Sequence, residues 1–276
     1  MPSAADAPSD RASVGRRWHR GTEAVGSGTL LALRLSKRSP FLRRRIWVRA
    51  ATRYFAGDPS RSALMAVFSQ SRSTGCDWWD YWLLHRYVAH RQPKRILELG
   101  SGVSTAVLAD AARGDILSVE ESGEWAEETR RLLTPSMRAR TSVSVVPRIE
   151  DTWRREFWGF RYADLPKGPF DFIFVDGPSS HRDAYASRHG MQGVCLDLLY
   201  LLESHPQAVG DVIIDGRKSS ALAYASVLPR GVVRYDHCLR IGVIPQVRGL
   251  QLVARQSTVS LLQADPWWLL EIPHWG

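Results

Sequence analysis

The fold is decided by residues 94–111, which read KRILELGSGVSTAVLADA. A short apolar run leads into the turn Gly100-Ser101-Gly102, and a run typical of a helix follows at once. This order predicts a buried strand, a tight turn and a helix. In open α/β sheets such a turn lies at the carboxyl end of the first strand, where ligands bind. Glycine lets a ligand approach the backbone closely, and the helix N-terminus offers free N–H groups.

Two acidic residues stand near this turn. Glu98 lies two residues before Gly100, where its carboxylate could receive the amino group of a zwitterionic ligand. Glu120 follows the next apolar run, 116–119, about 20 residues after the turn. An acid at that distance can accept hydrogen bonds from both hydroxyls of a ribose. The alternative for Glu120 is capping of the helix expected at 124–133. The turn and Glu120 together predict a ligand that contains adenosine.

Further polar residues follow the later strands. Glu150 comes after the third expected strand, where it could accept from an adenine amino group or lie in an exposed loop. Asp176 and Asp215 follow the fourth and fifth strands, in Asp-Gly-Pro and Asp-Gly-Arg. His181, five residues after Asp176, is the best candidate for a base because histidine titrates near neutral pH. An exposed loop histidine is the alternative, and His237 is a weaker candidate.

The rest of the chain repeats the order of strand and helix. Segment 152–167 is aromatic and basic with no clean period, and we expect a loop or a short helix there. An antiparallel pair of strands is expected to close the sheet. The strands are expected at 95–99, 116–119, 142–146, 170–175, 211–214, 232–235 and 249–255.

Size and composition are those of an ordinary globular protein. The chain has 276 residues, of which 44% are hydrophobic and 24% charged. We see no apolar run approaching the roughly 20 residues of a membrane span, and no apolar signal-peptide core, so a cytoplasmic location is expected. Cys76, Cys195 and Cys238 are scattered without metal-binding spacing, which predicts free thiols.

The positive charge is concentrated at the N-terminus. The first 60 residues carry 12 Lys and Arg against four acidic residues, and thus nearly all of the net charge of +9. We expect a disordered basic tail at 1–28, a helical extension at 29–75 and a catalytic domain at 76–276. Within the extension, 41–56 predicts a basic amphipathic helix. It could bind an anionic membrane surface, nucleic acid or an acidic substrate, or dock its apolar face on the domain with its arginines in solvent.

The glycine turn and the acidic residues together resemble the motifs of class I S-adenosylmethionine-dependent methyltransferases, over about residues 77–256. The resemblance implies an α/β fold, a Rossmann-like three-layer sandwich. Its seven-stranded, mostly parallel sheet would have the order 3-2-1-4-5-7-6, with the N-terminal helices as an extension. It also implies that S-adenosylmethionine is bound by Glu98, Gly100, Ser101, Gly102, Ser104, Glu120, Glu150 and Asp176.

The segments FVDGP and IIDGR are similar to those of small-molecule and sugar O-methyltransferases. This resemblance implies methyl transfer to a hydroxyl of a small-molecule or glycan acceptor, with His181 and Asp176 at the transfer centre. Some such enzymes hold a divalent cation at these strand ends, where Asp176 and Asp215 could bind Mg²⁺. Gly216 stands where a further ligand is usual. Asp-Gly-Pro replaces the motif of DNA and amine methyltransferases, which argues against nucleic acid as the substrate.

Two other functions stay open from the sequence. A nicotinamide-dependent oxidoreductase has a similar turn and ribose acid, but Glu98 and Thr105, in place of a third glycine, disfavour it. A protein that binds the nucleotide without turnover would carry the same cofactor residues. The oligomeric state and the acceptor's identity have no signature in the sequence.

Overall fold

The computed structural model describes residues 49, 51–58, 61–71, 78–181, 192–237, 239–257, 259 and 261. The expected tail at 1–28 lies outside these ranges, and so do residues 41–48 of the helix expected at 41–56. Within them, no helix combines the length and the apolar character that crossing a bilayer requires.

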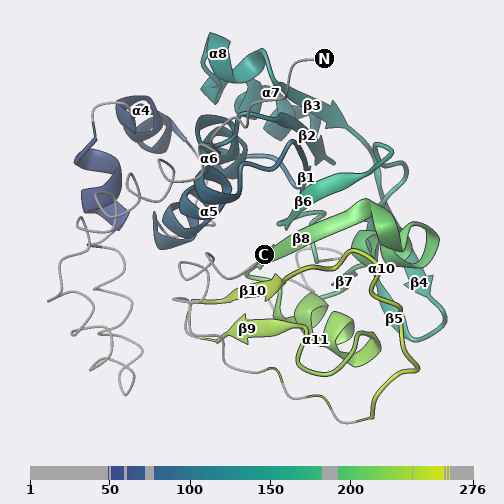
Figure 1. Ribbon diagram of the computed structural model, residues 1–276. Coiled ribbons are helices and arrows are strands. Elements are labelled where there is room, and N and C mark those ends of the chain that lie inside the picture. Colours follow the sequence, from purple (N-terminus) through teal and green to yellow (C-terminus); the bar gives the residue numbers. More distant parts are fainter. Residues whose placement is uncertain are drawn as a thin grey trace, which may run out of the picture.

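A seven-stranded sheet forms the centre of the molecule (Figure 1). Its strand order is β3-β2-β1-β6-β8-β10-β9. β10 is antiparallel to both of its neighbours and the other pairs are parallel. Counted along the chain within this sheet, the order is 3-2-1-4-5-7-6, which confirms the expected topology. The bounds are β1 Arg95–Leu99, β2 Asp115–Glu120, β3 Thr141–Val145, β6 Phe170–Val175, β8 Val209–Asp215, β9 Arg234–Asp236 and β10 Ile241–Ile244.

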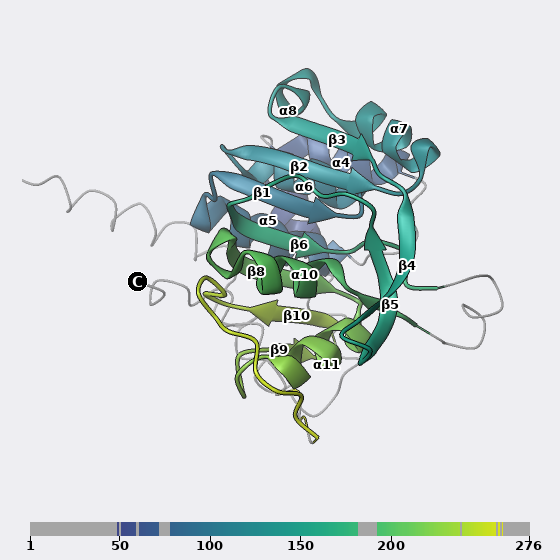
Figure 2. The same ribbon diagram turned by 90° about the vertical axis from the view of Figure 1, so that its right-hand side faces the viewer.

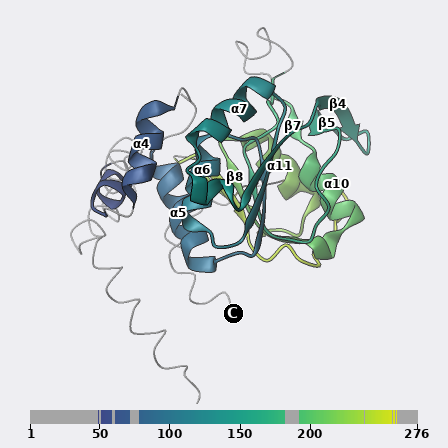
Figure 3. The same cartoon turned by 90° about the horizontal axis from the view of Figure 1, so that it is seen from above.

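Helices cover both faces of the sheet, which makes three layers (Figure 3). Each face has its own apolar core, because successive side chains of a strand point to opposite sides. In β6, Phe172 and Phe174 belong to one core, and Ile173 and Val175 to the other. The first core packs against α4 Ser62–Gln70, α5 Trp78–Arg91, α6 Val103–Ala111, α7 Gly123–Leu132 and α8 Pro135–Arg138. The second packs against α10 Asp197–Ser204 and α11 Lys218–Val227, with the short 3₁₀ helix η3, Pro206–Ala208, between α10 and β8.

A second, three-stranded sheet lies across the carboxyl ends of the main strands (Figure 2). It consists of the antiparallel hairpin β4 Arg148–Trp153 and β5 Phe157–Tyr162, with β7 Val194–Cys195 parallel to β5. The expectation of a loop or short helix at 152–167 is therefore wrong. The turn of the hairpin contains no glycine, and Arg154 and Arg155 adopt positive φ there instead (49° and 57°).

The end of the main sheet also differs from expectation. β10 begins only five residues after β9 ends, and residues 249–255 form no strand. The turn is tight because the Asp236 carboxylate accepts from Leu239 N (3.0 Å), and Arg240 takes a φ of 56°. Val253 N instead donates to Val227 O at the end of α11.

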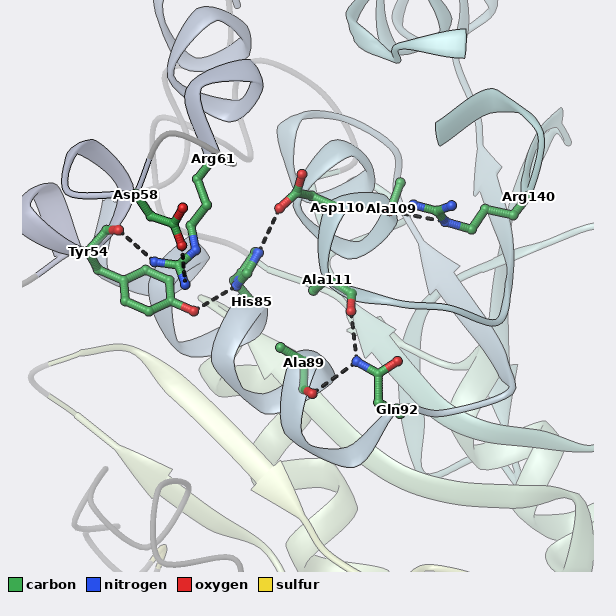
Figure 4. A network of polar contacts seen from close by, with 10 residues as sticks. All are labelled: Tyr54, Asp58, Arg61, His85, Ala89, Gln92, Ala109, Asp110, Ala111 and Arg140. Carbon is green, nitrogen blue, oxygen red and sulfur yellow. Dashed lines mark hydrogen bonds and ion pairs between the residues drawn. The ribbon is translucent and has the colours of Figure 1, made fainter. Parts of the chain in front are cut away.

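The N-terminal helices dock on α5 and α6 (Figure 4). Ala51 and Phe55 are fully buried, whereas Arg49 is exposed. Tyr54 Oη lies 3.1 Å from His85 Nδ1, and His85 Nε2 lies 2.9 Å from Asp110 Oδ2 on α6. The described part of the expected basic helix therefore packs its apolar side on the domain. Binding to a membrane surface stays a prediction.

Candidate functional site

Two glycine loops meet where the strand order reverses, between β1 and β6. Gly100 N donates to Val119 O, and Asp176 N donates to Leu99 O (both 2.8 Å), so each loop is tied to a neighbouring strand. Gly100 has a φ of 91°, and a Cβ there would lie 2.7 Å from Gly177 N. Both positions require glycine, because the two backbones touch with no room for a side chain.

A pocket of about 220 Å³ opens beside these loops, at the carboxyl ends of the parallel strands. This is the edge at which open α/β sheets bind ligands. Its walls come from the glycine turn, the end of β2, α7, the end of β5 and the loops after β6 and β8. Five of the residues expected to bind the cofactor line it: Gly100, Ser101, Gly102, Glu120 and Asp176.

Glu120 is held over the glycine turn by backbone N–H groups. Its Oε2 accepts from Ser101 N (2.9 Å), and its Oε1 accepts from Ser122 N (3.0 Å). The residue is only 7% exposed. These bonds fix the direction of the carboxylate, and Oε1 keeps acceptor capacity because a carboxylate oxygen can take two donors. Such an oxygen suits a ligand hydroxyl.

Glu98 lies beneath the turn and does not line the pocket. Its side chain is fully buried, and its Oε2 accepts from Thr105 Oγ1 (2.6 Å), which in turn accepts from Gly102 N (3.0 Å). Burial raises the pKa of Glu98 to about 7. The structure thus gives Glu98 a place in supporting the turn, in contrast to the expected contact with a ligand amino group. Ser104 is also buried and away from the lining.

Asp176 and Arg217 face each other at the ends of β6 and β8. Burial, together with the neighbouring Asp215 carboxylate, raises the pKa of Asp176 well above its usual range, and the Arg217 guanidinium partly offsets this. Arg217 Nη2 lies 4.0 Å from Asp176 Oδ1 and donates to Asp176 O. Arg217 Nη1 donates to Pro178 O (2.7 Å). The guanidinium thereby fixes the loop that carries Asp176.

The donor set at these strand ends does not suit a resident Mg²⁺. Asp176 and Asp215 are the two carboxylates in question, and Gly216 adds no side-chain oxygen. Over the described ranges, no three His, Cys, Asp or Glu side chains gather in a way that could hold a metal. The positive guanidinium of Arg217 stands beside Asp176, where a cation would have to bind. We therefore derive no step through a metal ion.

Glu150 and His181 also lie outside the lining of the pocket. Glu150 is exposed on β4 and accepts from Trp158 Nε1 (2.7 Å), so it belongs to the hairpin and not to a loop after β3. His181 is half-buried, and its carbonyl accepts from Arg148 Nη1 (2.8 Å). Its role as a base stays a prediction, because residues 182–191, which follow it, lie outside the described part of the chain.

Several lining residues escaped the sequence reasoning. Trp125 and Thr129 lie on α7, and Tyr162 ends β5. Trp125 is 42% exposed on α7. Tyr162 gave no signal because the hairpin itself was not predicted.

The fold can now be compared with known proteins. The main sheet has the strand order 3-2-1-4-5-7-6, and its strand β10 is antiparallel to β8. The pocket lies where the strand order reverses. The fold is that of the class I methyltransferases. No protein-family model matches the chain, and no curated protein matches it.

Solved structures of methyltransferases are similar to the chain. An O-methyltransferase from Bacillus cereus in complex with S-adenosylhomocysteine is 19% identical, with a TM-score of 0.40 over 63% of this chain and 76% of that one. A putative O-methyltransferase from Klebsiella pneumoniae is 21% identical, with a TM-score of 0.40 over 65% and 77%. The O-methyltransferase TomG from Streptomyces achromogenes, in complex with S-adenosylmethionine, is 20% identical, with a TM-score of 0.36 over 62% and 73%. Likenesses this distant carry no argument about substrate or chemistry.

Proposed function

We propose that this protein binds S-adenosylmethionine in the pocket and transfers its methyl group to a hydroxyl of a small-molecule or glycan acceptor. The observation that carries the proposal is Glu120, whose carboxylate is fixed over the glycine turn by the N–H groups of Ser101 and Ser122. A fixed acidic acceptor beside a glycine turn, at the reversal point of a parallel sheet, is what an adenosine ligand requires.

The remaining lining supports the same ligand. A Cβ placed on Gly102 would meet nothing within 4 Å, so the turn borders open space that a ligand can enter. Trp125 and Leu132 offer apolar surface for a base. Glu120, Glu121 and Asp176 make the walls acidic, which favours a ligand that carries a sulfonium and an ammonium group.

The chain's own contribution would be to hold the two reactants in line and to accept a proton. S-adenosylmethionine, when bound, would supply an electrophilic methyl group, whose bond to sulfur breaks as the acceptor oxygen attacks, with S-adenosylhomocysteine as the leaving group. Asp176 lines the pocket and His181 does not, so the Asp176 carboxylate is the better placed proton acceptor for a hydroxyl. His181 is the second candidate for this step.

Calorimetric titration with S-adenosylhomocysteine tests the binding. We expect Glu120→Ala to weaken binding at least 10-fold, because the fixed acceptor is lost. Glu124→Ala serves as the matched control, since Glu124 is an exposed acid on α7 outside the lining. Titration with NAD distinguishes a nicotinamide-binding protein. A wild-type protein that binds NAD but not S-adenosylhomocysteine would contradict the proposal.

A methyl-transfer assay tests turnover. The protein, S-adenosylmethionine and panels of hydroxylated small molecules and glycans are incubated, and formation of S-adenosylhomocysteine is measured. We expect turnover with a hydroxylated acceptor and a large loss of turnover in Asp176→Asn. Binding of the cofactor without turnover on any acceptor panel would instead support a non-catalytic binding protein.

A further inference from the structure

Tyr162 is the last residue of β5, and it lines the pocket. Its backbone N–H donates to Asp197 Oδ1 (3.0 Å) at the start of α10. Its side chain is 1% exposed and belongs to the core beneath the hairpin. The ring therefore has one defined position, set by two elements that are distant in sequence.

The hydroxyl of Tyr162 is aimed at the junction of the two glycine loops. A Cβ on Gly177 would lie 2.5 Å from both Tyr162 Oη and Gly100 N, so the three groups converge on one point of the wall. The hydroxyl is buried and has no hydrogen-bond partner among the residues that the structure describes. A buried polar group without a partner costs free energy, and such groups in native proteins are expected to have a reason.

Other buried tyrosines of this chain do have partners. Tyr224 Oη donates to Cys195 O (2.6 Å), and Tyr87 Oη donates to Asp211. Burial, followed by the charges of Glu120 and Glu121, raises the pKa of Tyr162 well above its usual value, so its hydroxyl keeps the proton. Tyr162 therefore presents a hydrogen-bond donor in a pocket whose nearby carboxylates offer only acceptors.

We propose that Tyr162 is a cofactor-binding residue whose hydroxyl donates a hydrogen bond to an oxygen atom of the S-adenosylmethionine in this pocket. The inference rests on the proposed function and adds a residue to its site. A sugar hydroxyl needs both an acceptor and a donor, and Glu120 and Tyr162 supply one each. A carboxylate of the ligand needs donors alone, which Tyr162 also provides. The ribose and the carboxylate both offer an oxygen atom that can accept this hydrogen bond.

The test compares the affinity for ligand with the stability of the free protein. For Tyr162→Phe we expect the Kd for S-adenosylhomocysteine to rise about 3- to 10-fold, since one hydrogen bond is lost. We expect the Tm of the free variant to be unchanged or higher, because the hydroxyl removed has no partner there. Tyr224→Phe is the matched control: it loses an internal hydrogen bond, so its Tm should fall while its Kd stays that of the wild type.

A second ligand locates the contact. Methylthioadenosine contains the ribose but lacks the amino-acid carboxylate. A loss of affinity for both ligands in Tyr162→Phe assigns the bond to the ribose, and a loss for S-adenosylhomocysteine alone assigns it to the carboxylate. A Tyr162→Phe variant that binds both ligands as the wild type does would overturn the inference while leaving the proposed function standing. A wild-type protein that binds neither ligand would overturn both the inference and the proposed function.

Discussion

Replacing Gly177 by alanine would drive apart the two loops that form the floor of the pocket. The new Cβ would lie 2.5 Å from Gly100 N and 2.6 Å from Gly100 Cα. Ordinary van der Waals contact begins at 3.4 Å, so the backbones would have to separate by roughly 0.9 Å. The two Gly100 atoms belong to the main chain, which cannot rotate away as a side chain could, and Tyr162 Oη also lies 2.5 Å from the new Cβ.

The expected cost follows from this overlap. Overpacking of this kind destabilises proteins by about 1–3 kcal/mol. We expect the upper part of that range, because moving the loops also stretches the bonds Gly100 N to Val119 O and Asp176 N to Leu99 O. Urea unfolding followed by tryptophan fluorescence measures the difference. Calorimetry should show loss of S-adenosylhomocysteine binding in the same variant, because the pocket floor has moved.

Gly102→Ala is the control for this prediction. Gly102 has a φ of 166°, extended backbone that any residue adopts, and its Cβ would meet nothing within 4 Å. We expect its unfolding free energy to change by less than about 0.5 kcal/mol. Its affinity for the ligand should still fall, since the methyl group would enter the pocket. If Gly177→Ala were as stable as Gly102→Ala, the close approach of the two loops would be refuted.

Four further predictions concern other features of the molecule. Burial raises the pKa of Glu98 to about 7 in the folded protein from its usual 4.5, so its contribution to stability is greatest below pH 4.5 and is lost as the pH rises through 7. Glu98→Gln should therefore flatten the pH dependence of the unfolding free energy between these values, and an unchanged slope in urea titrations would contradict this. Because Arg217 stands beside Asp176, the wild-type protein should retain no stoichiometric Mn²⁺ after gel filtration, as measured by electron paramagnetic resonance, and chelators should leave S-adenosylhomocysteine binding intact. Phe55 is fully buried between the N-terminal helices and α5, so Phe55→Ala should cost about 3–5 kcal/mol of unfolding free energy. Arg49→Ser should leave stability unchanged and lower co-sedimentation with anionic vesicles if the proposed membrane contact exists.

The sequence predicted those parts of the fold that local pattern controls. The apolar runs before Gly100 and Asp176 gave the central strands, because a parallel strand buried on both faces is nearly continuous in apolar residues. The spacing from the glycine turn to Glu120 placed that acid correctly on the pocket wall. In each case a few adjacent residues determine the structure.

The sequence predictions differ from the structure at turns that contain no glycine and at a side chain whose position depends on burial. The β4–β5 hairpin turns through Arg154 and Arg155, and β9–β10 turns near Arg240, so the usual turn residues gave no warning. Glu98 lies beneath the turn, where its carboxylate accepts from the hydroxyl of Thr105, and its expected contact with a ligand amino group stays a prediction. Tyr162 could not be found, because its place depends on pairing between segments far apart in the chain.

The helix α6 connects the glycine turn to the N-terminal extension as a single short rod. It begins at Val103, directly after Gly102, which lines the pocket, and it carries Asp110 near its other end, where His85 and Tyr54 connect it to the extension. With nine residues and a rise of about 1.5 Å per residue, the rod is only about 13 Å long. A displacement of the extension would thus act, within three helical turns, on the backbone that borders the pocket.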